Sequence, residues 1–264
     1  MKLSLPRTSA KPTPPAALLD GNPRAKLRRR LYGRLFAPLL GLLGAFALIA
    51  WQPQAISAEI NQVLPPPILD EPATGEHTAV AVLAGGCFWG VQGVFQHVRG
   101  VTRVLSGYSG GSADTAQYDT VSGGDTGHAE SVQIVYDPAK VSYGRLLQIY
   151  FSVALDPTQL NRQGPDSGTQ YRSAIFAVTP MQEKIALHYI AQLSAAQIFK
   201  RPIATRVTPF KGFYPAEDYH QNYLTLHPDD AYIAINDIPK VDNLKRLFPS
   251  VYQAQPVLVE VPKQ

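Results

Sequence analysis

Cysteine is almost absent from this chain, whose 264 residues include one, Cys87. A single thiol excludes an intramolecular disulfide and therefore a disulfide-stabilised scaffold. It also excludes a zinc site built from several thiolates. The sequence has six histidines, which are scattered and include no His-x-x-x-His pair. We therefore expect no metal site.

Basic charge is scarce outside the N-terminal region. The formal net charge is +4, but residues 1–58 hold 9 of the 24 Lys and Arg residues and one acid, Asp20. The remainder has 15 basic and 19 acidic residues. A nucleic-acid-binding domain needs a basic face, so we expect no nucleic-acid partner. Hydrophobic residues make up 45% of the chain, which is enough for a globular core.

The N-terminal 58 residues have the composition of a targeting segment. Residues 1–27 are rich in Pro, Ala, Lys and Arg, which predicts disorder, and a basic cluster leads into an apolar run, Leu35–Trp51. This run is long for the apolar region of a signal peptide and short for a full membrane span of about 20 residues. We expect a signal peptide or a membrane anchor. A buried core helix and an organelle-targeting segment are the alternatives.

The basic flank of the apolar run would stay in the cytoplasm. The rest of the chain would then lie in the bacterial cell envelope, either in the periplasm or anchored to the inner membrane and facing outward. After the leader, four prolines predict a linker at 59–77. The compact domain is expected at 78–252, with a tail at 253–264.

The domain alternates strand and helix patterns. We expect strands at 78–84, 101–107, 129–136 and 172–178, and helices at 87–97, 143–154 and 181–196. This order predicts an α/β (α+β two-layer sandwich) fold with helices packed on a mixed sheet, a ferredoxin-like core. Long loops are expected at 108–127 and 155–170. Beyond 210 the pattern predicts irregular chain with a short helix near 240–248.

Cys87 follows a strand and two glycines and opens a helix. The free N–H groups and the dipole of a helix N-terminus favour an anion, so we expect a lowered pKa and a reactive thiolate. Phe88 and Trp89 come next and either belong to the core or line the mouth of a site. The alternative for the cysteine itself is a small buried hydrophobe.

The two long loops end in polar blocks. Glu130 closes the first block at the start of a strand, where partial burial would raise its pKa and let it hold a proton. A solvated glutamate at a strand end is the alternative interpretation. Tyr118 and Tyr171 lie in these loop regions and could act as phenolic hydrogen-bond donors.

Three ordered blocks resemble the A-type peptide methionine sulfoxide reductases. They are Gly86-Cys87-Phe88-Trp89-Gly90, residues 124–130 and residues 168–173, with Tyr-Asp-Pro at 136–138 between the last two. The resemblance covers about residues 78–250, and it implies that Cys87 attacks the sulfur of the S epimer of methionine sulfoxide. Glu130 would protonate the sulfoxide oxygen, and Tyr118 and Tyr171 would hydrogen-bond it.

The resemblance also implies substrate-binding residues. Phe88 and Trp89 would enclose the S-methyl group, and Asp166 and His220 would help to hold the substrate. Many relatives resolve the sulfenic acid left on the nucleophile with a second cysteine. This chain has none, and its segment 226–252 resembles the one-cysteine branch instead.

Regeneration of Cys87 then requires an external thiol, from a thioredoxin-like protein, a glutaredoxin or a small molecule. We expect no bound cofactor, a monomer, and a substrate that is free or protein-bound methionine sulfoxide. Two other functions remain open from the sequence. One is a one-cysteine thiol peroxidase, although the apolar neighbours of Cys87 suit a methyl group better than a peroxide. The other is a non-catalytic module that binds methionine-containing peptides.

Overall fold

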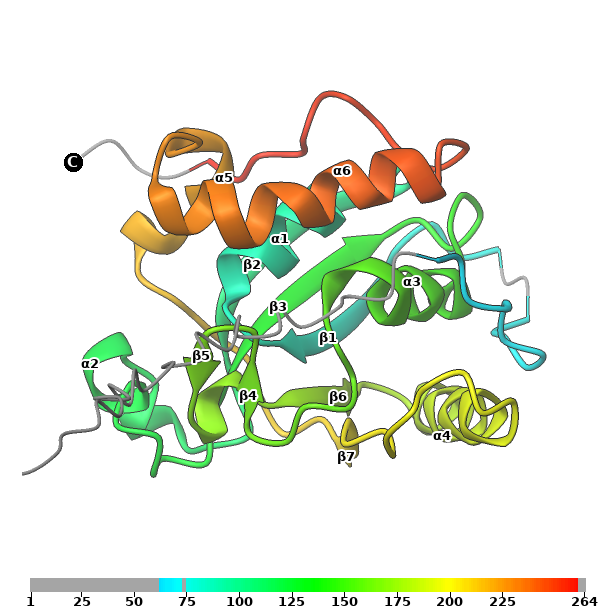
Figure 1. Cartoon of the computed structure of the whole chain (residues 1–264), viewed down its shortest axis with the longest axis horizontal. Helices are drawn as coiled ribbons and strands as arrows, with labels where there is room; N and C mark the ends of the chain where they lie inside the picture. Colours follow the sequence, from blue (N-terminus) through cyan, green and yellow to red (C-terminus); the bar gives the residue numbers. More distant parts are fainter. Residues whose placement is uncertain (1–61, 73–74, 261–264) are drawn as a thin grey trace, which may run out of the picture. The chain divides into compact units, whose positions relative to one another are not determined.

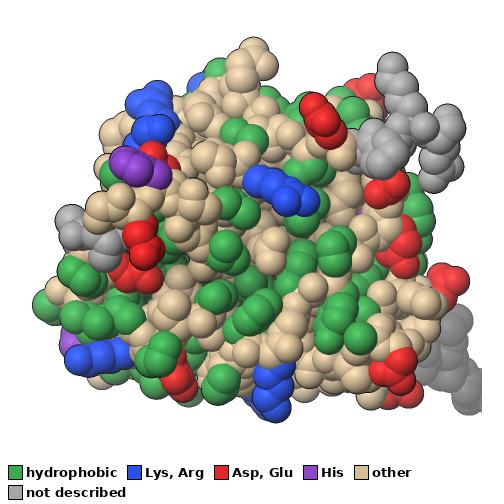
Figure 2. Space-filling view, turned by 180° about the vertical axis from the view of Figure 1, so that it is seen from behind, with side chains coloured by type: hydrophobic (Ala, Val, Ile, Leu, Met, Phe, Trp, Pro, Cys, Tyr) green, Lys and Arg blue, Asp and Glu red, His purple; other side chains and the backbone are tan. Residues whose placement is uncertain are grey.

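The computed structural model describes residues 62–72 and 75–260. The predicted disordered leader and the predicted signal peptide or anchor at 1–58 lie outside the described residues. Within 62–72 and 75–260, no helix combines the length and apolar character that a membrane span needs. Figure 2 shows acidic and basic side chains dispersed among hydrophobic and neutral groups on the back of the molecule.

A six-stranded mixed sheet forms the centre of the domain (Figure 1). Its order is β7-β6-β1-β3-β2-β8, and β6–β7 is its parallel pair. The strands are β1 (Ala79–Gly85), β2 (Val101–Ser109), β3 (Ala129–Tyr136), β6 (Ser173–Ala177), β7 (Arg206–Pro209) and β8 (Tyr214–Pro215). The central order β6-β1-β3-β2 with helical crossovers is the split βαβ arrangement of ferredoxin-like folds. The predicted fold class is confirmed.

Alternating side chains of β1 face two different clusters, as the pleat of a strand requires. Ala81 and Leu83 belong to the large core beneath the helices, whereas Val82 and Ala84 belong to a small cluster on the other face. Residues that pack on the large core come from α1 (Phe88–Gln96), α3 (Tyr143–Ile149), α4 (Pro180–Ala195) and α6 (Ile238–Leu247). The helices therefore form one layer on the sheet.

Both long loops contain short elements that place polar residues. The first carries a 3-10 turn (Ala113–Thr115) and α2 (Tyr118–Val121), and the second carries the hairpin β4 (Arg162–Gln163) and β5 (Asp166–Ser167) and a 3-10 turn (Thr169–Tyr171). The chain beyond 210 is more ordered than predicted. It forms β8, a 3-10 turn (Asp218–His220), α5 (Tyr223–Leu226), a π-helical turn (Ile233–Asp237) and α6.

The described part of the predicted linker, residues 62–72, packs against the domain. Leu64 is 1% exposed and belongs to the large core. Its backbone N–H donates to Ser152 Oγ at 3.2 Å, and the carbonyl of Pro65 accepts from the Tyr189 hydroxyl at 2.7 Å. A proline-rich segment forms no hydrogen bonds within itself, so its backbone carbonyls need other donors. Here side chains of the helical layer donate hydrogen bonds to them. In the tail, Val259 N–H similarly donates to Asn222 at 3.1 Å.

This packing predicts that Leu64→Ala lowers the free energy of unfolding by about 2–4 kcal/mol, because a buried leucine leaves a cavity. Urea denaturation of the chain from residue 59 onward measures the change. Ile68→Ala is the matched control, because Ile68 is 81% exposed in the same segment and its loss should cost less than about 0.5 kcal/mol. Equal effects of the two substitutions would contradict the docking of this segment.

Candidate active site

A pocket of about 200 Å³ opens at the N-terminus of α1. Its lining residues are Cys87, Phe88, Trp89, Tyr118, Glu130, Asp166, Tyr171 and Tyr232. The structure thus brings seven of the eight sequence-predicted site residues to one cavity, and His220 lies behind Trp89. A cavity of about 150 Å³ can hold benzene, so this pocket has room for a methyl sulfoxide group.

Cys87 occupies the N-cap of α1, and its side chain is buried. The turn that delivers it depends on Gly86, which has a φ of +89°. A Cβ at this position would also stand 2.5 Å from Cβ of Gln163. Glycine alone combines this backbone conformation with so close an approach. The strand β1 can therefore turn sharply and place the thiol at the floor of the pocket.

The expectation of a lowered pKa for Cys87 is wrong. Burial raises the pKa of the thiol well above its ordinary value, and the carboxylates of Glu130 and Asp237 raise it further. The backbone N–H of Trp89 at the helix N-terminus and the Lys240 cation act in the opposite direction but do not outweigh them. Desolvation and like charge thus exceed the effect of the helix N-terminus.

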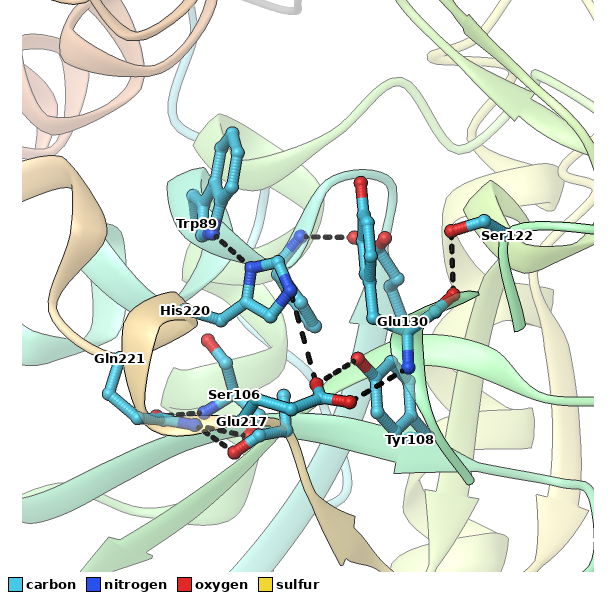
Figure 3. Close-up of polar contacts among 11 residues, drawn as sticks. Trp89, Ser106, Tyr108, Ser122, Glu130, Glu217, His220 and Gln221 are labelled. Carbon is cyan, nitrogen blue, oxygen red and sulfur yellow. Dashed lines mark hydrogen bonds and ion pairs between the residues drawn. The ribbon is translucent and has the colours of Figure 1, made fainter. Parts of the chain in front are cut away.

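Glu130 is the second residue of β3 and is buried. Its Oε2 accepts a hydrogen bond of 3.0 Å from the backbone N–H of Phe88 in the first turn of α1 (Figure 3). Burial raises the pKa of Glu130 to about 8, although the Phe88 N–H lowers it in part. The carboxyl therefore holds its proton at neutral pH, in agreement with the raised pKa predicted from the sequence.

The two tyrosines reach the pocket from the two long loops. Tyr118 is the first residue of α2, and Tyr171 ends a 3-10 turn. Burial raises the pKa of both phenols most, and the Glu130 carboxyl raises it further, so both phenols are neutral donors. Arg172 joins the loop ends, because its guanidinium donates to the carbonyls of Gly127 and Thr169, each at 2.8 Å. The loops are thereby fixed relative to each other.

His220 supports Trp89 and does not line the pocket. The Trp89 indole N–H donates to His220 Nδ1 at 3.2 Å (Figure 3). The other side of the indole stacks on Tyr223 with ring centroids 3.9 Å apart and an angle of 11°. Burial lowers the pKa of His220, which keeps the imidazole neutral. Sequence reasoning placed His220 at the substrate, whereas the structure places it one layer behind, holding the pocket wall.

Glu217 organises this part of the site and was not predicted. Its carboxylate accepts from the Tyr108 hydroxyl and from the backbone N–H of Tyr118, both at 2.9 Å. It also lies 4.0 Å from Nε2 of His220 (Figure 3). One carboxylate thus joins β2, α2 and the turn that carries His220. The spacing of Glu217 and His220, three residues apart, was the available signal, but their segment was predicted to be irregular.

Tyr232 is a lining residue that sequence reasoning also missed. Its hydroxyl donates to the carboxylate of Asp166, and its ring meets Trp89 edge-on with centroids 6.1 Å apart. Burial raises the pKa of Asp166, which the bond from Tyr232 and the Lys240 cation partly offset.

Among the described residues, no group of three or more His, Cys, Asp and Glu side chains is placed to hold a metal ion.

Comparison with known proteins assigns the chain to a family. The family model described as "Peptide methionine sulfoxide reductase" matches residues 79–251. A protein of Mesorhizobium japonicum named "Peptide methionine sulfoxide reductase MsrA 2" is 61% identical over 190 residues, which are 72% of this chain and 96% of the relative. A Synechocystis protein of the same name is 52% identical over 74% of this chain and 92% of the relative.

Two solved structures share the fold. Mxr1 from Saccharomyces cerevisiae in reduced form is 33% identical with a TM-score of 0.51, covering 60% of this chain and 90% of that one. Methionine sulfoxide reductase A of Corynebacterium diphtheriae is 35% identical with a TM-score of 0.50, covering 63% and 85%. With the pocket, the family match and relatives of this identity in agreement, the chain belongs to the peptide methionine sulfoxide reductase family, in its A type.

Proposed function

We propose that this oxidoreductase, a peptide-methionine (S)-S-oxide reductase, uses Cys87 as its nucleophile and Glu130 as its acid. The observation that carries the proposal is the hydrogen bond between the Glu130 carboxyl and the first turn of the helix that Cys87 caps. It places a neutral acid and a thiol in one small pocket. The substrate is methionine sulfoxide, either free or within an oxidised protein.

In the proposed reaction, the sulfur of Cys87 attacks the sulfoxide sulfur while Glu130 donates its proton to the sulfoxide oxygen. The attack forms a bond between the two sulfurs. This bond and the S–O bond of the substrate then break as the protonated oxygen passes to Cys87, which leaves a sulfenic acid on Cys87 and releases the thioether. The thiol proton restores Glu130. Methionine sulfoxide gains two electrons and becomes methionine, and the thiol loses them.

Tyr118 and Tyr171 are proposed to donate hydrogen bonds to the sulfoxide oxygen as negative charge develops on it. Both phenols line the pocket and are neutral, which supports this role. Phe88 and Trp89 would contact the S-methyl group. Asp166 would bind the substrate backbone, with its carboxylate held in place by Tyr232.

The raised pKa of Cys87 fits this sequence of events. A thiol that stays protonated between turnovers is protected from oxidation, because the thiolate is the species that oxidants attack. A protonated Glu130 removes the charge that, among the neighbouring carboxylates, raises the pKa of the thiol most. We propose that the thiolate forms only after the sulfoxide has displaced water and brought a proton acceptor next to Glu130.

The sulfenic acid is proposed to be reduced by an external thiol, since the chain has no second cysteine. One thiol forms a mixed disulfide with Cys87 and releases water, and a second thiol then frees the enzyme. A thioredoxin-like protein, a glutaredoxin or a small thiol can each supply these two electrons. The peroxidase and the binding-module alternatives are not favoured, because the family model and the named relatives are all methionine sulfoxide reductases.

We further propose that the protein acts as a monomer in the bacterial cell envelope. The basic cluster followed by the apolar run 35–51 supports this location. Fractionation of cells that carry the full chain should find it in the periplasmic or inner-membrane fraction, with a protease-sensitive domain in spheroplasts. Recovery of the full-length chain from the cytosol would contradict the proposed location and leave the chemistry unaffected.

Single-turnover reduction tests the proposed chemistry. The chain from residue 59 onward, without reductant, should consume about one equivalent of the S epimer of a methionine sulfoxide peptide and none of the R epimer. Dimedone should then label Cys87, and Cys87→Ser should be inactive. Glu130→Gln keeps an acceptor for the Phe88 N–H but has no acidic proton to transfer, so its rate should fall about 10²–10⁴-fold.

Three outcomes would contradict this account. Consumption of hydrogen peroxide without sulfoxide reduction would establish the peroxidase. Peptide binding without any turnover would establish a binding module. A folded Glu130→Gln protein with the rate of the unaltered protein would remove Glu130 from the role of acid.

A further inference from the structure

A buried ion pair lies behind the pocket. Asp237 closes the π-helical turn, Lys240 lies in α6, and Oδ1 of the first is 3.1 Å from Nζ of the second. The side chains are 0% and 6% exposed. Neither residue lines the pocket, and the proposed chemistry uses neither of them.

The ion pair touches the first turn of α1. A Cβ on Gly90 would stand 2.1 Å from Oδ1 of Asp237 and 3.0 Å from Nζ of Lys240. The ion pair therefore lies so close to the backbone of Gly90 that no other residue would fit at this position. Gly90 is the third residue of the helix that Cys87 caps, and the backbone N–H of Trp89, the second residue, acts on the thiol. The sulfur and the ion pair thus adjoin the same helical turn.

Stability alone does not account for this pair. Removing two charges from water costs several kcal/mol per ion, and a buried pair is often no better for stability than apolar groups. Oδ2 of Asp237 is buried and has no hydrogen-bond partner in the described part of the chain. Buried carboxylates are normally satisfied at both oxygens. An incompletely satisfied charge beside a reactive group points to a role in the site.

We propose that the Asp237–Lys240 pair is a positioning element of the Cys87 site, which supports the helical turn that receives the thiolate and sets its charge environment. The inference rests on Cys87 being the reacting group. The two charges act in opposite directions at low polarity: Asp237 raises the pKa of Cys87 and Lys240 lowers it. Asp237 also raises the pKa of Glu130, after the larger effects of burial and Asp166.

Other titratable groups face Cys87 from the remaining elements, and substitutions in the ion pair leave them in place. They are Glu130 on β3, Tyr118 on α2, Asp166 on β5, Tyr171 on the second 3-10 turn and Tyr232 beside the π-helical turn. Because Asp237 also raises the pKa of Glu130, the substitutions are compared in a Glu130→Gln background, where this carboxyl does not titrate and a change in thiol reactivity can be assigned to the ion pair.

The test is the rate at which iodoacetamide alkylates Cys87 at pH 8, followed by mass spectrometry. The chain has one cysteine, so the rate reports a single thiol. Asp237→Asn keeps the size of the side chain and removes the negative charge, and it should raise the rate about tenfold. Lys240→Met removes the positive charge and should lower the rate about tenfold. Both estimates assume a shift of about one unit in the pKa of Cys87, which changes the thiolate fraction about tenfold.

Lys140→Met is the matched control. Lys140 pairs with Asp137 at the same sequence spacing and at 3.2 Å, but its side chain is 66% exposed and water screens it. This substitution should leave the rate unchanged. Changes of the same sign in Asp237→Asn and Lys240→Met, or no change in either, would overturn the proposal in favour of a packing role.

Two further measurements keep the test decisive. Circular dichroism reports whether each variant folds, and if Lys240→Met does not fold, the sign of the Asp237→Asn effect decides the question alone. Alkylation needs no sulfoxide, so a failed ion-pair prediction is distinct from a failure of the proposed reductase reaction. The double variant should return the rate to within about threefold of the unaltered protein if charge is the cause.

Discussion

The site depends on one hydrogen bond, from the backbone N–H of Phe88 to the buried carboxyl of Glu130. It joins the central strand β3 to the first turn of α1, and so it sets the distance between the acid and Cys87. The same burial that creates this contact keeps Glu130 protonated at neutral pH. An ionised carboxylate in this position would repel the thiolate that must form beside it.

The chain after β7 supports most of the pocket from behind. Glu217 holds Tyr118, His220 holds the indole of Trp89, and Tyr232 holds Asp166. The segment between β7 and α6 has no long helix. It contributes to the site through these side-chain hydrogen bonds and not through regular secondary structure. These hydrogen bonds hold the lining side chains in place, and donors already in place stabilise developing charge without first having to reorient.

The sequence predicted what local patterns determine. The strand 129–136 was predicted with the bounds that β3 has, because its alternation is regular and Asp137-Pro138 ends it. The placement of Asp166 at the site came from the family resemblance, whereas Tyr118 and Tyr171 were already expected as donors from their place in the loop regions. The pKa of Cys87 was mispredicted, because burial and the carboxylates of Glu130 and Asp237 raise it, and these are effects of tertiary packing that the local sequence does not contain. Tertiary packing likewise docks the proline-rich segment around Leu64, and no local pattern encodes it.

A site-resolved titration of Glu130 tests the central claim most directly. Carbon-13 NMR of the chain labelled at glutamate side chains, with Glu130→Gln to assign the resonance, follows this one carboxyl as the pH rises. The account predicts a midpoint near 8, with the carboxyl protonated at pH 7. A midpoint near that of an ordinary glutamate, about 4.3, would contradict it, because a carboxylate cannot then donate the proton that the sulfoxide oxygen requires.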